Sequence, residues 1–235
     1  MKTFTSIIRN LLRLPKVLRK KDLYIAVQHS CRKISLGNDG ANFSICTDNL
    51  PQNPIVYSFG AGMDISFDLE LIHKFNATVY VCDPTPKSLA WLRTQNLPDK
   101  FVLSDFGLAH FDGITQFHLP QNPAYVSASI VKTNENTSET VEVKMKRLTS
   151  AMKEFMHLGI DILKMDIEGA EYEVIKDIAS TLPDVKQIVI EFHHRIPNIG
   201  IEKTKQAIQT LNRIGYKIFD VSDTGEEISF IKINS

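Results

Sequence analysis

Cysteine is scarce in this chain of 235 residues, and its placement excludes two kinds of structural site. The three cysteines, Cys31, Cys46 and Cys82, lie far apart in the sequence, and none belongs to a CxxC pair. A disulfide framework needs an even set of cysteines, and a zinc knuckle needs closely spaced ones. The sequence therefore predicts reduced thiols, as in a cytoplasmic protein.

An excess of charge is also missing. Lysine and arginine together number 27, as do aspartate and glutamate, so the formal net charge is zero. A surface that binds nucleic acid usually leaves a basic excess, because it has to neutralise phosphates. We therefore expect no nucleic-acid partner. The length suits one large domain or a domain with an extension.

No apolar run approaches the ~20 residues that are needed to span a bilayer. The first 21 residues are nevertheless unusual, because they hold seven basic side chains, no acidic one, and apolar residues at helical spacing between Phe4 and Leu12. We predict a basic amphipathic helical extension over residues 1–32, followed by one domain over residues 33–235. Such a helix can lie on an anionic membrane surface, or it can pack on its own domain or on a second copy in a homodimer.

Short apolar runs alternate with helical patterns after Pro54. Strands are expected at residues 55–59, 78–82, 101–103, 160–165, 187–192, 216–221 and 227–233, and the intervening patterns predict helices. Strands that alternate with helices predict an α/β fold whose parallel sheet is covered on both faces. In such sheets, ligands bind beyond the carboxyl ends of the strands.

Two further segments are expected to pair locally. Asn38-Asp39-Gly40 separates two alternating runs and predicts a hairpin over residues 33–46. Asp112-Gly113 predicts a second hairpin turn between short strands, and the polar residues 132–140 predict a loop.

A glycine turn, Gly60-Ala61-Gly62, ends the first strand of the alternating region. Glycine lets the backbone approach a cofactor closely, and the helix after the turn presents free amides to an anionic group. Asp83 follows Gly62 by 21 positions, at the end of the next strand, where an acid can bind ribose hydroxyls. A dinucleotide site would place a third glycine at position 65, where this chain has Ile65. The pattern therefore favours a nucleoside cofactor other than NAD or FAD.

Four segments carry a family resemblance. They are residues 56–68, residues 82–86, residues 161–171 and residues 190–194, of which the Lys-x-Asp-x-Glu-Gly-x-Glu run from Lys164 to Glu171 is the most specific. With them, the chain resembles the FkbM-type methyltransferases over roughly residues 34–233. The resemblance implies a class I, Rossmann-like fold: a doubly wound, mostly parallel sheet of seven strands with an antiparallel last strand. It also implies S-adenosylmethionine as cofactor, O-methylation as the reaction, and a hydroxyl of a saccharide or related small natural product as the acceptor.

The resemblance also suggests which residues hold the cofactor. They are Ser58, Gly60, Ala61, Gly62, Asp64, Asp83, Pro84, Asp105, Phe106 and Asp166. Many members of the family carry an acid two residues before the first glycine, where this chain has Ser58. The amino group of the cofactor is therefore expected to rely on Asp64 or on backbone carbonyls.

Acidic residues and a histidine supply the candidate chemistry. A neutral alcohol is a poor nucleophile, so a nearby base should take its proton, and Asp166 and His193 are the first candidates. Glu168 and Glu191 are expected to orient the acceptor hydroxyls or to support the base. Alternatively, Asp166, Glu168, Glu191 and His193 converge on a divalent metal. Glu171 is expected to favour the start of its helix.

Two other functions remain open at this stage. One is a catalytically silent assembly module that keeps a nucleoside-cofactor fold, and the other is a nicotinamide-dependent oxidoreductase. Acceptor specificity is expected in the irregular residues 109–139 and 194–201.

Overall fold

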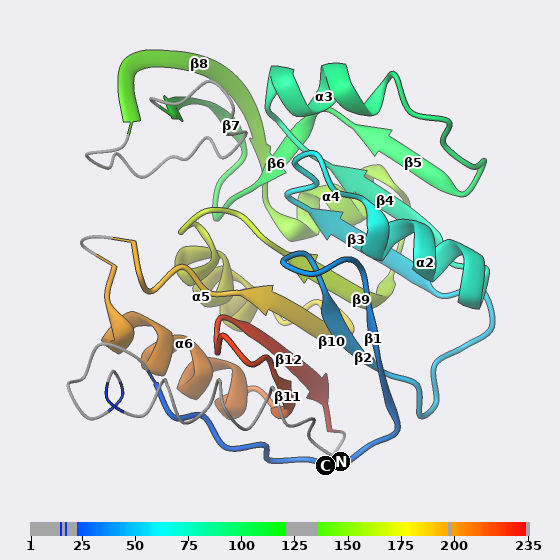
Figure 1. The fold of residues 1–235 in the computed structure, drawn as a ribbon, viewed down its shortest axis with the longest axis vertical. Helices are drawn as coiled ribbons and strands as arrows, with labels where there is room; N and C mark the ends of the chain where they lie inside the picture. Colours follow the sequence, from blue (N-terminus) through cyan, green and yellow to red (C-terminus); the bar gives the residue numbers. More distant parts are fainter. Residues whose placement is uncertain (1–14, 16, 18–22, 121–135, 197–198, 234–235) are drawn as a thin grey trace.

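A seven-stranded sheet forms the centre of the fold in this computed structural model, which describes residues 15, 17, 23–120, 136–196 and 199–233 (Figure 1). Its strands are β3 (Ile55–Phe59), β4 (Thr78–Cys82), β5 (Phe101–Ser104), β9 (Gly159–Met165), β10 (Asp184–Glu191), β11 (Tyr216–Val221) and β12 (Glu227–Lys232). They lie in the order β11-β12-β10-β9-β3-β4-β5. Strand β12 runs antiparallel to both neighbours, whereas the pairs from β10 to β5 are parallel. The structure confirms the predicted sheet, including its antiparallel last strand.

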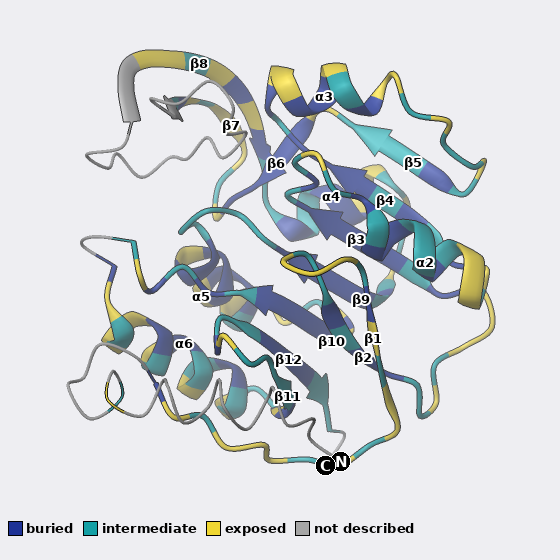
Figure 2. Ribbon diagram, viewed as in Figure 1, coloured by how far each residue is buried: buried dark blue, intermediate teal, exposed yellow. Residues whose placement is uncertain are grey.

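Helices cover both faces of this sheet. They are α2 (Ser66–Phe75), α3 (Pro86–Leu92), α4 (Leu148–Glu154), α5 (Glu171–Thr181) and α6 (Ile201–Arg213). The apolar side chains of α4, α5 and α6 pack with Leu163 and Met165 on one face. Those of α2 pack with Val56 and Ile162 on the other. Because both faces are covered, the central strands are largely buried (Figure 2), which explains why the sequence shows them as mostly apolar runs.

The predicted N-terminal hairpin is confirmed and lies against the α2 face. It consists of β1 (Lys33–Leu36) and β2 (Phe43–Cys46), paired antiparallel. The side-chain amide of Gln187 on β10 donates to the Cys46 carbonyl and accepts from the Cys46 N–H, each at 2.8 Å. Phe43 packs edge-on against Phe67 of α2, with the ring centroids 5.5 Å apart. The hairpin thus forms a further layer on the face of the sheet that α2 covers.

A separate three-stranded sheet differs from the prediction. It contains β6 (Phe106–Leu108), β7 (Gly113–Pro120) and β8 (Asn136–Lys146) in the order β6-β8-β7. Asp112-Gly113 does not form a hairpin turn between paired strands, because β8 lies between β6 and β7. The loop predicted over residues 132–140 is also wrong from Asn136 onward, because β7 supplies a pairing partner for this polar stretch.

The predicted amphipathic helix falls largely on residues outside those that the structure describes. Residues 23–32 run without helix or strand along β11, where the backbone N–H groups of Gln28 and His29 both donate to the Ile218 carbonyl. Within the described ranges, none of the helices has the length and apolar character needed to cross a membrane.

Candidate active site

The glycine turn lies directly against the strand that carries Asp166. Gly60 has φ +82°, and a Cβ built on it would lie 1.7 Å from the backbone oxygen of Asp166. The Asp166 N–H in turn donates to the Phe59 carbonyl at 3.1 Å. Only glycine fits so close an approach in this left-handed conformation. The glycine turn and Asp166 are therefore held together by direct contacts between their backbones.

A cavity of about 350 Å³ opens at the carboxyl ends of β3, β4 and β9, a volume typical of small-molecule sites. Eight of the predicted site residues line it: Gly60, Ala61, Gly62, Asp64, Asp83, Pro84, Asp166 and Glu168. The sequence predicts these groups at one edge of the sheet, and in the structure they line one cavity.

Asp83 is held rigidly within this wall. Its Oδ2 accepts the Gly62 N–H at 3.0 Å, and its Oδ1 accepts the N–H and hydroxyl of Thr85 at 2.8 and 2.7 Å. A carboxylate has about four acceptor positions, so Oδ2 keeps room for one further donor. The residue thus links the glycine turn to the start of α3 and still faces the cavity.

Three of the predicted cofactor residues are not brought to the cavity. Asp105 is exposed and pairs with Lys144 at 3.2 Å, on another part of the surface. Phe106 is buried in the core, where its ring packs near Phe59 with centroids 6.4 Å apart. Ser58 is fully buried behind the wall. The chain leaves β5 and enters β6, so Gly107 and Leu108 line the cavity in place of Asp105 and Phe106.

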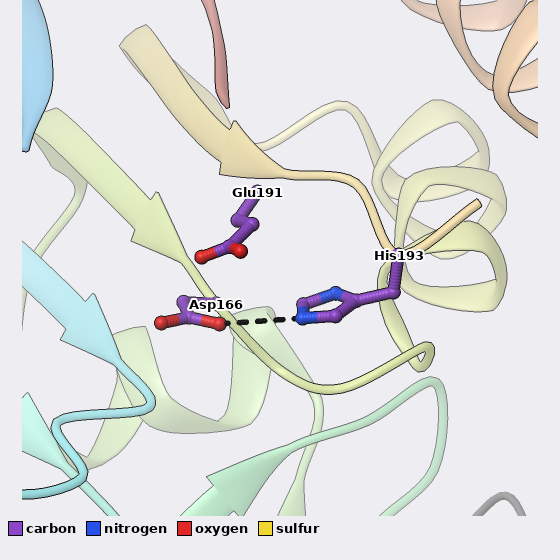
Figure 3. Close-up of side chains that lie close together, drawn as sticks. All are labelled: Asp166, Glu191 and His193. Carbon is purple, nitrogen blue, oxygen red and sulfur yellow. Dashed lines mark ion pairs between the residues drawn. The ribbon is translucent and has the colours of Figure 1, made fainter. Parts of the chain in front are cut away.

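An acid–histidine cluster adjoins the cavity (Figure 3). Asp166 follows β9, Glu191 ends β10, and His193 lies two residues beyond; each offers an atom within 4.8 Å of the others. Nε2 of His193 lies 3.6 Å from Asp166 Oδ1 and 3.6 Å from Glu168 Oε2. All four predicted catalytic residues therefore lie in one place, and Asp166 and Glu168 belong to both the cluster and the cavity wall.

Backbone strain accompanies this arrangement at Glu168. Its φ of +51° falls in the left-handed region, which is uncommon for a residue with a side chain. Such strain costs roughly 1 kcal/mol or more and tends to occur at functional sites. Gly169 follows with φ +96°, so the chain turns sharply between β9 and α5. This turn carries the Glu168 side chain back to the cluster.

Glu171 belongs to this cluster, although the sequence indicated only a favourable helix start for it. Its fully buried carboxylate accepts the Gly169 N–H at 2.8 Å through Oε2 and the His193 N–H at 2.9 Å through Oε1. The same Oε1 lies 3.3 Å from Nδ1 of the His193 ring. An Nδ1–H donated to Glu171 fixes the ring orientation and leaves Nε2 facing Asp166 and Glu168.

The carboxylates around His193 determine how it is charged. Burial alone lowers the pKa of the imidazole, but the hydrogen bond to Glu171 and the charges of Glu171, Glu168 and Asp166 raise it to about 10. Burial, followed by the charge of Asp166, raises the pKa of Glu191 to about 8. At neutral pH the ring therefore holds both protons, and burial together with the charge of Asp166 favours the neutral form of Glu191.

Comparison with known proteins agrees with this geometry. The sequence profile of the methyltransferase FkbM domain matches residues 54–218. Methyltransferase sdnD of Sordaria araneosa is 29% identical over 177 residues, which cover 61% of this chain and 68% of that protein. The human probable methyltransferase-like protein 24 is 26% identical over 156 residues, covering 65% of this chain and 36% of that protein. This chain thus spans about a third of the length of the human relative.

Among solved structures, the FkbM methyltransferase of Methylobacillus flagellatus superposes with a TM-score of 0.48 at 13% sequence identity, over 79% of this chain and 45% of that one. The domain profile covers more than half of the present chain and includes the glycine turn, Asp83 and the cluster residues. The chain belongs to the FkbM methyltransferase family.

Proposed function

We propose that this methyltransferase transfers a methyl group from S-adenosylmethionine to a hydroxyl oxygen of a saccharide or similar polar acceptor. The observation that carries the proposal is the position of Asp166. Its side chain lines the cavity beside the glycine turn, and its Oδ1 faces the His193 ring at 3.6 Å. A group able to handle a proton thus adjoins the place where a nucleoside cofactor fits.

The cavity wall suits the cofactor. S-adenosylmethionine, when bound, supplies an electrophilic methyl group, so the protein has mainly to align an acceptor with it. Gly60, Ala61 and Gly62 would let the backbone approach it, and the remaining acceptor position of Asp83 would take a ribose hydroxyl. Ile65 is buried in the core where a dinucleotide fold would have its third glycine, which supports a mononucleoside over a nicotinamide cofactor.

The cluster suits a hydroxyl acceptor. Carboxylates of Asp166 and Glu168 are hydrogen-bond acceptors, and a polyol offers several donors to them. Since His193 already holds two ring protons at neutral pH, we assign proton acceptance to Asp166. His193 then holds Asp166 in place and balances its charge. In its protonated form, which burial favours, Glu191 would donate to an acceptor oxygen.

Labelled methyl transfer tests the proposal. With S-adenosylmethionine labelled in its methyl group, we expect label to enter members of a panel of free saccharides, at an oxygen located by mass spectrometry. The Asp166→Asn variant serves as control and is expected to transfer at least 100-fold more slowly. Label found only on nitrogen or carboxylate acceptors would contradict the hydroxyl assignment. No cofactor binding at millimolar concentration would favour the silent assembly module instead.

A divalent cation is a second candidate component of the site. Asp166, Glu191 and His193 offer two carboxylate oxygens and one imidazole nitrogen, a set that suits Mn²⁺, Fe²⁺ or Zn²⁺. Glu171 beside Nδ1 supports this, because a metal-binding histidine usually donates its other ring N–H to a carboxylate. Such an ion would lower the pKa of a hydroxyl in contact with it.

Chelation separates a metal-dependent site from one in which His193 supplies the positive charge. If the cation is required, dialysis against EDTA should lower turnover at least 100-fold, and added Mn²⁺ should restore it. Mn²⁺ binding, followed by electron paramagnetic resonance, should be lost in Glu191→Gln and kept in Glu202→Gln, a control at an exposed carboxylate. Full turnover in protein stripped of metal would exclude the cation.

A further inference from the structure

A buried carboxylate with an unsatisfied oxygen forms part of the cavity wall. Asp68, in the first turn of α2, lines the cavity, has only 1% of its surface exposed, and its Oδ1 has no hydrogen-bond partner among the residues that the structure describes. Burying a carboxylate is costly unless a hydrogen-bond donor or a cation compensates it. The free oxygen therefore points to a cationic ligand.

Three side chains meet behind the glycine turn. Ser58 on β3 is the direct neighbour of Lys164 on β9. Side chains alternate along a strand, and Val56 and Ile162 pack towards α2, so Ser58 and Lys164 also face α2 and Asp68. The hydroxyl of Ser58 is buried and, like Asp68 Oδ1, completes no hydrogen bond within the described chain. Position 58 thus holds no acidic residue, but Asp68 on α2 lies close to it.

The pKa of Asp68 and the charges around it favour a cationic ligand at this site. Burial raises the pKa of Asp68 to about 6, although the charge of Lys164 acts in the opposite direction. The ammonium group of Lys164 makes its polar contacts with other groups. Its Nζ donates to the Gly60 carbonyl at 2.7 Å and lies 3.9 Å from Asp166 Oδ2. The charge of Lys164 therefore offsets only part of the free energy that it costs to bury the Asp68 carboxylate.

The groups that the sequence suggested for the amino end of the cofactor already have partners. Asp64 Oδ1 accepts the Ser66 N–H at 2.8 Å, and Oδ2 accepts from the Asn38 side chain at 3.2 Å. The Gly60 carbonyl accepts from Lys164. Asp68, by contrast, is a buried acid on this wall with an oxygen that completes no hydrogen bond among the described residues.

We propose that Asp68 binds the positively charged amino group of S-adenosylmethionine, taking from α2 the role that an acid at position 58 would have. This inference rests on the proposed function, since it assumes that cofactor. Asp83 and Asp68 line the same cavity, so one cofactor would contact the first with its ribose and the second with its amino group. Asp68 is then a binding residue for the cofactor and does not take part in the chemistry.

Two ligands that differ only at the amino-acid end test this assignment. S-adenosylhomocysteine carries the amino group, whereas 5′-methylthioadenosine has the same nucleoside without it. By calorimetry at pH 8, Asp68→Asn, which keeps the shape of the side chain, should raise the Kd for S-adenosylhomocysteine by roughly 10- to 100-fold, as expected for a lost charged hydrogen bond. The Kd for 5′-methylthioadenosine should stay within about twofold. Asp83→Asn should weaken both ligands.

The alternative is that Asp68 only balances Lys164, which predicts equal losses for both ligands and would overturn the assignment. Unchanged affinity of Asp68→Asn for S-adenosylhomocysteine would overturn it as well, while leaving the proposed function intact. A wild-type protein that binds neither ligand contradicts the proposed function itself, and this inference with it. If Asp68→Asn does not fold, Asp68→Glu replaces it. Its displaced carboxylate should reduce the preference for S-adenosylhomocysteine over 5′-methylthioadenosine. An unchanged preference would contradict the assignment.

Discussion

Gly60→Ala is expected to lower the free energy of unfolding by about 3 kcal/mol or more, the largest stability loss of any single substitution that we propose. The added Cβ would lie 1.7 Å from the Asp166 backbone oxygen, and φ at this position is +82°. The position of the Cβ is fixed by the backbone, and the Asp166 oxygen is a backbone atom, so neither can rotate away. Urea unfolding measures the loss, and calorimetry on the folded fraction should show weaker binding of S-adenosylhomocysteine.

Gly62→Ala is the matched control, two residues further along the same turn. Gly62 also has a positive φ, of +54°, but a Cβ there would meet nothing within 4 Å. Its expected cost is about 1 kcal/mol, the strain of the left-handed conformation alone. Equal losses in the two variants would show that the close approach of Gly60 to Asp166 is not the cause.

His193→Ala is expected to lower turnover by roughly 100-fold, because Asp166 loses the group that holds it in place, while leaving the affinity for S-adenosylhomocysteine within about twofold. His193 holds Asp166 and Glu168 through Nε2 and is itself held by Glu171, but it does not line the cofactor cavity. Removing it therefore disturbs the acceptor side of the site. Turnover from labelled cofactor and calorimetric Kd together measure both effects.

His73→Ala, at an exposed position of α2, controls for the loss of an imidazole as such. It should leave both turnover and affinity unchanged. Wild-type turnover in His193→Ala would remove His193 from the chemistry, and a parallel loss of cofactor affinity would move it to the cofactor site.

The sequence alone was enough to predict the central sheet, because its strands are buried on both faces. Strands such as β3 and β4 therefore appear as short, mostly apolar runs, and their alternation with helices predicts parallel pairing. The second sheet was not predictable in this way. Its order places β8 between β6 and β7, and no local turn pattern encodes a pairing between segments that are distant in sequence.

The candidate site was predictable where it follows from strand ends. Gly60, Asp83 and Asp166 each come directly after or just beyond a parallel strand, and all such ends meet at one edge. Asp105 and Phe106 were misplaced because the direction of the chain after β5 depends on its pairing with β8.

The sequence indicated only a helix start for Glu171 and did not distinguish Asp68 at all, and both outcomes have the same physical reason. Each is an acid in the first turn of a helix, and the helix dipole is sufficient to explain such a residue. Their burial, and the contact of Glu171 with a histidine 22 residues later, arise only from tertiary packing.

The position of β12 has a consequence for how the protein is made. This strand is the last in the sequence, yet it lies inside the sheet, between β10 and β11. As the chain emerges from the ribosome, β10 and β11 both lack β12 as a pairing partner until residue 232 has been synthesised. A nascent chain or a truncated product ending before Glu227 would leave β10 as an open edge, beside apolar surface that Ile228 and Phe230 normally cover. Such an edge invites pairing with other chains, so the final hairpin protects the sheet from aggregation.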